Sequence, residues 1–181
     1  DSYDPQSRKP TVAFGDNLDD DLVRRDFTIG AMAVRLPSRA FVDPYNGLGA
    51  LESRTITTPG SATTSFTDDP LRMMRAARFV SQLGFSLAPE VRAAMSDMAD
   101  RIAIVSAERV RDELTKLIVG AQPWEGIDAL VDTGLADHIL PEVSGLRLER
   151  DEHHRHKDVY QHSLTVLRQA VQLEAEYAKR A

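Results

Sequence analysis

The sequence predicts an α+β fold in which a mixed α/β part is followed by an all-α part. Before residue 60, short β-branched and aromatic runs alternate with short helical patterns, whereas after residue 70 helix start and stop signals follow one another. Between these parts, residues 57–67 are rich in Thr, Ser, Pro and Gly, a composition typical of a break. We therefore expect three regions, which comprise residues 1–60, 61–145 and 146–181.

The first region should hold short strands and short helices joined by turns. Strand patterns cover residues 11–14 and 40–42, and helical patterns cover residues 16–25, 29–36 and 48–56. Residues 43–47 should form a turn, because Pro44 fixes φ and Gly47 tolerates a positive φ.

The rest of the chain reads as consecutive helices. The patterns cover residues 69–84, 89–101, 106–119 and 124–132, with Pro70 suited to the first helical position and Gly84 to the C-cap. A polar run at 149–157 is typical of a linker, and a last helical pattern runs to residue 181 with no stop signal. Because the chain also begins without Met, we expect it to be a piece of a longer protein.

Composition narrows the classes of protein to which the chain can belong. The chain has 181 residues, 42% hydrophobic and 28% charged, which is ordinary for a globular protein. It contains no cysteine, which excludes disulfides, thiolate catalysis and Cys-ligated metals. The net charge is -6, but residues 71–120 carry 8 Lys and Arg against 6 Asp and Glu, a local excess of +2. An anionic partner could therefore be held there.

The strongest constellation of polar residues begins the second region. If Asp69 starts a helix, Arg72, Arg75 and Arg78 follow it as a stripe opposite the apolar face, because each residue advances about 100°. Guanidinium groups can clamp phosphates, and an Asp/Arg pair offers an acceptor and a donor to the edge of a base. The alternative reading is a solvated cationic face without a ligand.

A second constellation lies in the first region, where Arg24 and Arg25 precede Asp26. Two guanidinium groups beside a carboxylate could hold a triphosphate and a ribose hydroxyl together. The alternative is a local ion pair that closes one helix.

Four segments, in this order and at these separations, carry a resemblance to a known family. They are "RRDFTIGAMAV", "DPYNGL", "DDPLRMMRAARFVSQLGF" and "SAERVRDELTKLI". The sequence from about residue 19 to 139 thereby resembles the bacterial tRNA nucleotidyltransferase (CCA-adding) and poly(A) polymerase family. The resemblance implies the C-terminal part of a nucleotidyltransferase head (1–60), a helical neck that recognises nucleotide and RNA (61–145), and a linker with the start of an HD-like helical body (146–181).

The resemblance also implies a reaction, its partners and roles for residues. A cytoplasmic enzyme would add CCA to tRNA from CTP and ATP without a template, and its side chains would select the base. It would not contact a membrane, and a homodimer is left open. Asp26 would contact the ribose and Arg25 the nucleotide, and Asp69 and Arg72 would read the base, with Arg75 and Arg78 extending the same surface. Three further residues would brace the recognition helix, namely Glu108, Arg109 and Glu113.

The sequence departs from the family pattern in three ways. Gly30 stands where the family has Asn, and Asp68 replaces a Glu. The family's phosphate-binding Gly-Ser loop and its metal-binding Asp-x-Asp pair are not found in this sequence. Residues 19–21 contain Asp-x-Asp, but we interpret them as acids at a helix start. We therefore expect this chain alone to be inactive, because Mg²⁺ would be bound by residues upstream of it.

Two alternatives to CCA addition stay open. Poly(A) polymerase shares these motifs and uses ATP only. In a different class, the chain could be a non-catalytic RNA-binding helical module or an HD-type metal phosphohydrolase, in which His162 would be a metal ligand. Without the rest of an HD site, His162 and its neighbouring histidines could equally be surface residues.

Overall fold

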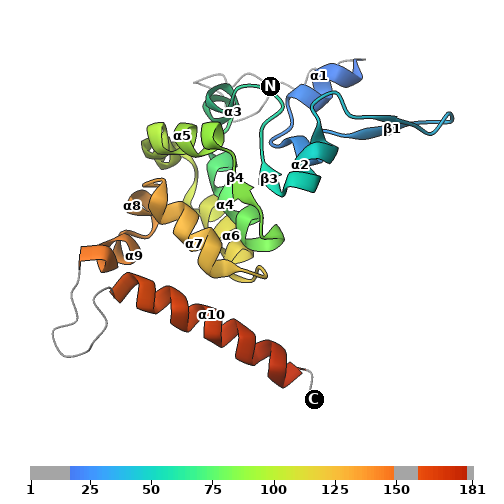
Figure 1. Cartoon of the computed structure of the whole chain (residues 1–181). Helices are drawn as coiled ribbons and strands as arrows, with labels where there is room; N and C mark the ends of the chain where they lie inside the picture. Colours follow the sequence, from blue (N-terminus) through green and yellow to red (C-terminus); the bar gives the residue numbers. More distant parts are fainter. Residues whose placement is uncertain (1–16, 149–158, 179–181) are drawn as a thin grey trace.

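The computed structural model describes residues 17–148 and 159–178. The strand expected at 11–14 and the linker at 149–157 lie outside these residues. Within them the order of elements is mixed up to residue 56 and almost wholly helical afterwards, as the sequence predicts. In Figure 1, helix α4 (Leu71–Leu83) lies in the middle of the molecule, beside α6 (Ala107–Ile118) and α7 (Pro123–Asp132).

The segment that precedes α4 is built from short elements. They are α1 (Leu18–Val23), the 3-10 turn η1 (Thr28–Gly30), the antiparallel strands β1 (Ala33–Arg35) and β2 (Ala40–Val42), α2 (Gly47–Ser53), β3 (Thr55–Ile56) and α3 (Ala62–Asp68). The β1–β2 hairpin projects from the body of the molecule (Figure 1). β3 pairs in parallel with β4 (Ser86–Leu87), which follows α4.

The prediction of a helix over residues 29–36 is wrong. A 3-10 turn ends at Gly30, and β1 then pairs with β2 so that Val34 lies opposite Phe41. A short apolar run is ambiguous between helix and strand, and here pairing with a neighbouring strand decides for the strand. The turn at 43–47 is present, but Asn46 rather than Gly47 adopts the left-handed conformation, with φ of 56°.

The break expected at residues 57–67 contains most of helix α3. The Ser61 side chain accepts a hydrogen bond from the Thr64 N–H at 3.5 Å, and Ala62, Ser65 and Phe66 are buried on one side of the helix. A cap and burial thus outweigh the low helix propensity of threonine. One cluster of buried side chains includes Ile56 and Phe66, which lie on opposite sides of residue 60 in the sequence. The division of the chain into two structural units near residue 60 therefore stays a prediction.

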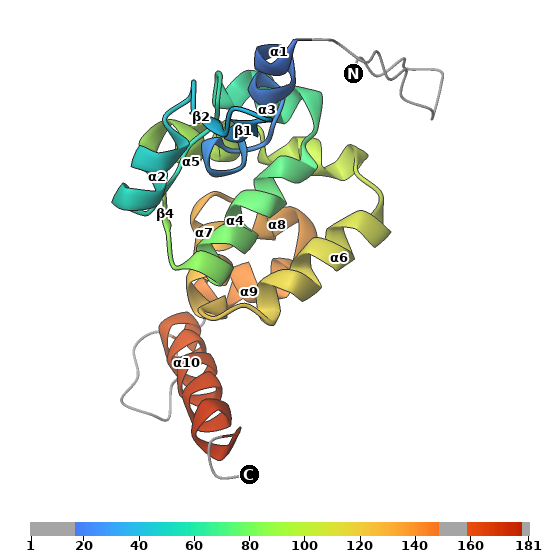
Figure 2. The same cartoon turned by 90° about the vertical axis from the view of Figure 1, so that its right-hand side faces the viewer.

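The helices after α4 agree with the patterns in the sequence and add short turns. α5 (Pro89–Asp97) is followed by the 3-10 helix η2 (Ala99–Ile104), and α8 (Ala136–Ile139), α9 (Pro141–Gly145) and η3 (Leu146–Leu148) follow α7. α10 (Val159–Ala178) packs against α7 and η3 near its start and then extends away from the body (Figure 2). No helix in the described ranges is long and apolar enough to cross a membrane.

Candidate functional site

The arginine face of α4 is engaged with the rest of the protein rather than solvated. Leu71, Met73, Met74, Ala76 and Ala77 of this helix are buried. Arg72, Arg75 and Arg78 are only partly exposed. Arg72 and Arg75 contact the segment at residues 24–26, and Arg78 contacts Glu113 of α6. The reading of this stripe as a solvated cationic face is therefore wrong.

Asp26 forms a two-donor ion pair with Arg75. Its Oδ2 accepts from Arg75 Nε at 2.8 Å and from Arg75 Nη2 at 2.5 Å, and its Oδ1 accepts from the Phe27 N–H at 3.0 Å. The Asp26 side chain is 18% exposed. This pair links the loop after α1 to the middle of α4.

Arg72 is held by two groups that the sequence does not single out. Its Nη1 donates to Ser65 Oγ at 2.8 Å, and its Nη2 donates to the Arg24 carbonyl oxygen at 2.7 Å. A hydroxyl on a neighbouring helix and a backbone carbonyl carry no pattern in the sequence that marks them as partners of an arginine.

Asp69 lies in the joint between α3 and α4. The sequence predicts Asp69 as the first residue of the helix over residues 69–84, and this part of the prediction is wrong. Its backbone is extended, with φ of −146° and ψ of 102°. Asp69 Oδ1 accepts from the Leu71 N–H at 3.1 Å, and Oδ2 accepts from Arg109 Nη2 at 2.8 Å. Pro70 has no N–H to donate and Leu71 begins the helix, so Asp69 satisfies a free donor of its first turn.

Glu113 is the buried acid beneath the arginine face, with 4% of its surface exposed. Its carboxylate lies 2.6 Å from Arg78 Nε, 3.2 Å from Lys116 Nζ and 3.7 Å from Arg75 Nη1. Arg78 also donates to Gln82 Oε1 at 2.8 Å, and its guanidinium lies 4.2 Å from the centre of the Phe79 ring. A buried carboxylate needs such partners, because an unpaired buried charge is costly.

The remaining candidate residues lie outside this network. Arg25, just after α1, pairs at 2.9 Å with Asp21 of that helix, and both side chains are about half exposed. Residues 19–21 occupy the first turn of α1, where the cap itself is Asn17. Glu108 is exposed at the start of α6, and His162 lies on α10. Among the described residues, no group of three or more His, Cys, Asp or Glu side chains could hold a metal.

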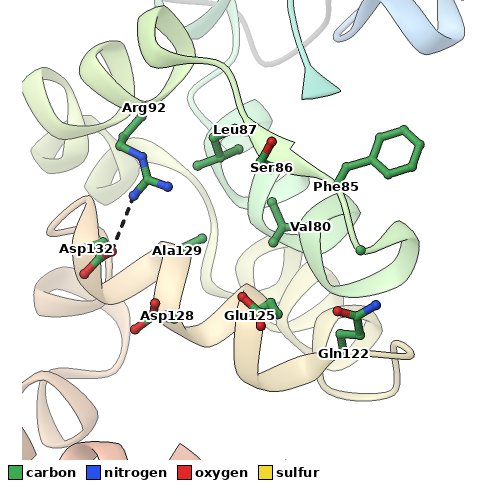
Figure 3. A pocket seen from close by; sticks show the side chains of 11 residues that line it. Val80, Phe85, Ser86, Leu87, Arg92, Gln122, Glu125, Asp128, Ala129 and Asp132 are labelled. Carbon is green, nitrogen blue, oxygen red and sulfur yellow. Dashed lines mark hydrogen bonds and ion pairs between the residues drawn. The ribbon is translucent and has the colours of Figure 1, made fainter. Parts of the chain in front are cut away.

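A pocket of about 280 Å³ lies elsewhere, between β4, α5 and α7. Figure 3 shows Glu125, Asp128 and Asp132 along α7 at this pocket, with Arg92 paired to Asp132 at 3.4 Å. The pocket shares no lining residue with the network around Asp26 and Asp69. It is therefore a separate feature from the candidate site.

Next to this pocket, α10 is anchored by Tyr160. Tyr160 is 1% exposed, and its hydroxyl donates to Asp128 Oδ1 at 2.8 Å. The Arg147 guanidinium lies 4.9 Å from the centre of the ring and also pairs with Asp132. Burial raises the pKa of the Tyr160 hydroxyl above its usual range, and the hydrogen bond to Asp128 raises this pKa further.

Two family models match the chain on either side of the arginine face. Residues 1–57 match the poly A polymerase head domain, and residues 84–146 match the probable RNA- and SrmB-binding site of polymerase A. Asp26 thus lies in the first match and Glu113 in the second. Arg75 lies on α4 between them.

Curated relatives and solved structures agree with these matches. A CCA-adding enzyme of Lactobacillus johnsonii is 40% identical over 149 residues, which are 82% of this chain and 36% of that protein. A CCA-adding enzyme of Geobacillus kaustophilus is 43% identical over 133 residues, which are 74% of this chain and 33% of that protein.

Among solved structures, the Bacillus stearothermophilus CCA-adding enzyme in complex with CTP has a TM-score of 0.65 and 43% identity, covering 67% of this chain and 31% of that one. The Thermotoga maritima CCA-adding enzyme complexed with tRNA-CCA has a TM-score of 0.63 and 29% identity, covering 69% of this chain and 31% of that one. The chain spans about a third of the length of its curated relatives. It belongs to the family of bacterial CCA-adding enzymes and poly(A) polymerases.

Proposed function

We propose that the gene product containing this chain adds CCA to the 3′ end of tRNA from CTP and ATP, and that side chains of this chain select the base. The observation that carries the proposal is the joint between α3 and α4. There Asp69 offers a carboxylate and Arg72 a guanidinium, both held by other segments of the chain. The relatives named as CCA-adding enzymes and the solved complex with CTP support the same reading.

Base selection follows from hydrogen-bond complementarity. A carboxylate accepts from the exocyclic amine that cytosine and adenine carry, and a guanidinium donates to their ring acceptors. Uracil and guanine present the opposite pattern on that edge. Asp69 and Arg72 are therefore proposed to read C and A, while Arg25 and Asp26 hold phosphate and ribose.

The other residues of the network are proposed to keep this pair in place. Arg109 holds Asp69, and Glu113 holds Arg78 and lies near Arg75. Glu108, which lies in the exposed first turn of α6, is proposed to support α4.

The described residues do not fit a magnesium site, because they contain no group of three or more potential ligands. When bound elsewhere in the enzyme, Mg²⁺ would stabilise the attacking and leaving oxygens of nucleotidyl transfer. Three further proposals concern the full-length gene product. It contains an HD-like body with His162 as a metal ligand, it acts in the cytoplasm, and it forms a homodimer.

Poly(A) polymerase is the second candidate, since both matching family models carry that name. A non-catalytic RNA-binding module is the third, because one of these models describes a probable RNA-binding site. The CCA-adding enzyme uses CTP and ATP, poly(A) polymerase uses ATP only, and an RNA-binding module incorporates no nucleotide.

The test is incorporation by the full-length gene product on a tRNA that lacks its CCA end, with each labelled nucleoside triphosphate alone and with CTP and ATP together. CCA addition predicts that CTP and ATP together extend the tRNA by C, C and A, and that UTP and GTP are not used. A tRNA that already ends in CCA is the control and should not be extended. A homopolymer from ATP alone would indicate poly(A) polymerase, and RNA binding without incorporation would contradict both enzymes.

A further inference from the structure

Arg75 directs its guanidinium at a carboxylate of the protein instead of at an open surface. Two of its nitrogens donate to Asp26 Oδ2, at 2.8 and 2.5 Å, across 49 positions of the sequence. Because the planar guanidinium has its donors in a rigid arrangement, two of them converging on one oxygen fix the position of Oδ2. The Phe27 N–H, which donates to Oδ1 at 3.0 Å, sets the orientation of the other oxygen.

The other side of Arg75 faces a second acid. Glu113 lies 3.7 Å from Arg75 Nη1, and it is held in turn by Arg78 at 2.6 Å. Asp26 and Glu113 belong to the two segments that match different family models, and Arg75 on α4 lies between them. The position of Asp26 therefore depends on α6 through one arginine.

Oδ1 of Asp26 lies on the side of Gly30, a residue without a side chain. A Cβ built on Gly30 would lie 3.8 Å from Asp26 Oδ1, an ordinary van der Waals distance. Oδ2 accepts two bonds from Arg75 and Oδ1 accepts one backbone N–H, so Oδ1 has the greater remaining capacity to accept from a ligand hydroxyl. A carboxylate oxygen that accepts one backbone N–H has a lone pair left for such a hydroxyl.

We propose that Arg75 is a positioning residue, which fixes the Asp26 carboxylate so that Oδ1 accepts from the ribose 2′-hydroxyl, and that Glu113 sets Arg75 from the other side. This inference rests on the proposed role of Asp26 at the ribose. It differs from a direct contact of Arg75 with the triphosphate. In the positioning role Arg75 governs the choice of sugar, whereas in a phosphate contact it would govern nucleotide affinity regardless of sugar.

The test compares kcat/KM for CTP and dCTP in the full-length gene product with Arg75→Lys. Lysine keeps the charge and loses the paired geometry. We expect the preference for CTP over dCTP to fall by about tenfold, as for the loss of a hydrogen bond to a charged group, while the preference for CTP over UTP changes by less than about twofold. Arg111→Lys is the control, because Arg111 is an exposed arginine on α6 whose side chain is 71% accessible.

A double-mutant cycle separates positioning from a structural effect. If Arg75 acts through Asp26, Arg75→Lys has no further effect on the CTP/dCTP preference once Asp26→Ala is present. If Arg75→Lys raises KM for CTP and dCTP equally and leaves their ratio unchanged, Arg75 contacts the phosphates and the inference is wrong.

Failure of the underlying proposal gives a different result. If Asp26→Ala itself leaves the CTP/dCTP preference at the wild-type value, Asp26 does not contact the ribose, and the proposed role of Asp26 is overturned. If Asp26→Ala lowers the preference and Arg75→Lys does not, only the positioning role of Arg75 is overturned.

Discussion

Arg109 Nη2 lies 2.8 Å from Asp69 Oδ2, which ties the carboxylate at the start of α4 to a helix that begins almost forty residues later. Without this contact Asp69 would be held only by the Leu71 N–H and by its own backbone. The carboxylate proposed to read the base is thus oriented by α6, in the segment that matches the RNA-binding family model.

Glu113→Ala should lower the free energy of unfolding by about 3 kcal/mol, since removing one partner of a buried ion pair leaves the other charge uncompensated. The affected partner is Arg78, whose side chain is 11% exposed. The measurement is urea denaturation of the chain. Asp112→Ala on the exposed side of the same helix, where the Asp112 side chain is 56% accessible, is the matched control and should change stability by less than about 0.5 kcal/mol. Equal effects of the two substitutions would contradict the buried position of Glu113.

Gly47→Ala should destabilise the chain by about 1–3 kcal/mol, the usual cost of overpacking. A Cβ at Gly47 would lie 2.3 Å from the Thr28 carbonyl oxygen and 2.8 Å from Met32 Cγ, so backbone would have to move. Thermal denaturation against Gly60→Ala checks this, because no atom outside Gly60 and its chain neighbours lies within 4 Å of a Cβ at Gly60. A Gly47→Ala chain as stable as wild type would show that α2 does not pack closely on the turn after Phe27.

Tyr160 should ionise at higher pH than an ordinary tyrosine, because its pKa is raised by burial and by Asp128. The folded state then favours the protonated hydroxyl, so its contribution to stability is complete below about pH 10, the usual tyrosine pKa, and is lost as the pH rises further. A spectroscopic titration of the chain should show one late-ionising tyrosine that disappears in Tyr160→Phe. Ionisation of all tyrosines near pH 10 in the native chain would contradict the anchoring of α10 by this hydroxyl.

The helical part of the fold could be predicted because its signals are local. Gly84 and Gly134 end their helices with positive φ of 65° and 73°, and Pro123 begins α7. The helix that the sequence predicts over residues 29–36 is wrong, because the conformation there is decided by pairing of Val34 with Phe41 across a hairpin. The periodicity of a short segment does not show which strand will pair with it. Nor does it show the burial of Ala62, Ser65 and Phe66, which stabilises the Thr-rich helix α3.

The residues of the candidate site remain a prediction, but their placement in the fold can be compared with the sequence patterns. The sequence predicts that Arg72, Arg75 and Arg78 lie on one helix, and α4 contains all three. The sequence also predicts Asp69 on this helix, whereas Asp69 lies in the joint before it. The Ser65 hydroxyl and the Arg24 carbonyl that hold Arg72 could not be predicted, because one is an ordinary helix residue and the other is a backbone group.

The proposed role of Asp69 in base selection can be measured as the relative use of CTP and UTP by Asp69→Ala in the full-length gene product. We expect the preference for CTP over UTP to fall by an amount equivalent to about 1–3 kcal/mol, because the acceptor for the exocyclic amine is lost. Loss of the hydrogen bond to the Leu71 N–H should also lower stability by about 0.5–2 kcal/mol, as for a helix cap. If Asp69→Ala is less stable but keeps the wild-type CTP/UTP preference, Asp69 is a helix cap and not the base-selecting residue.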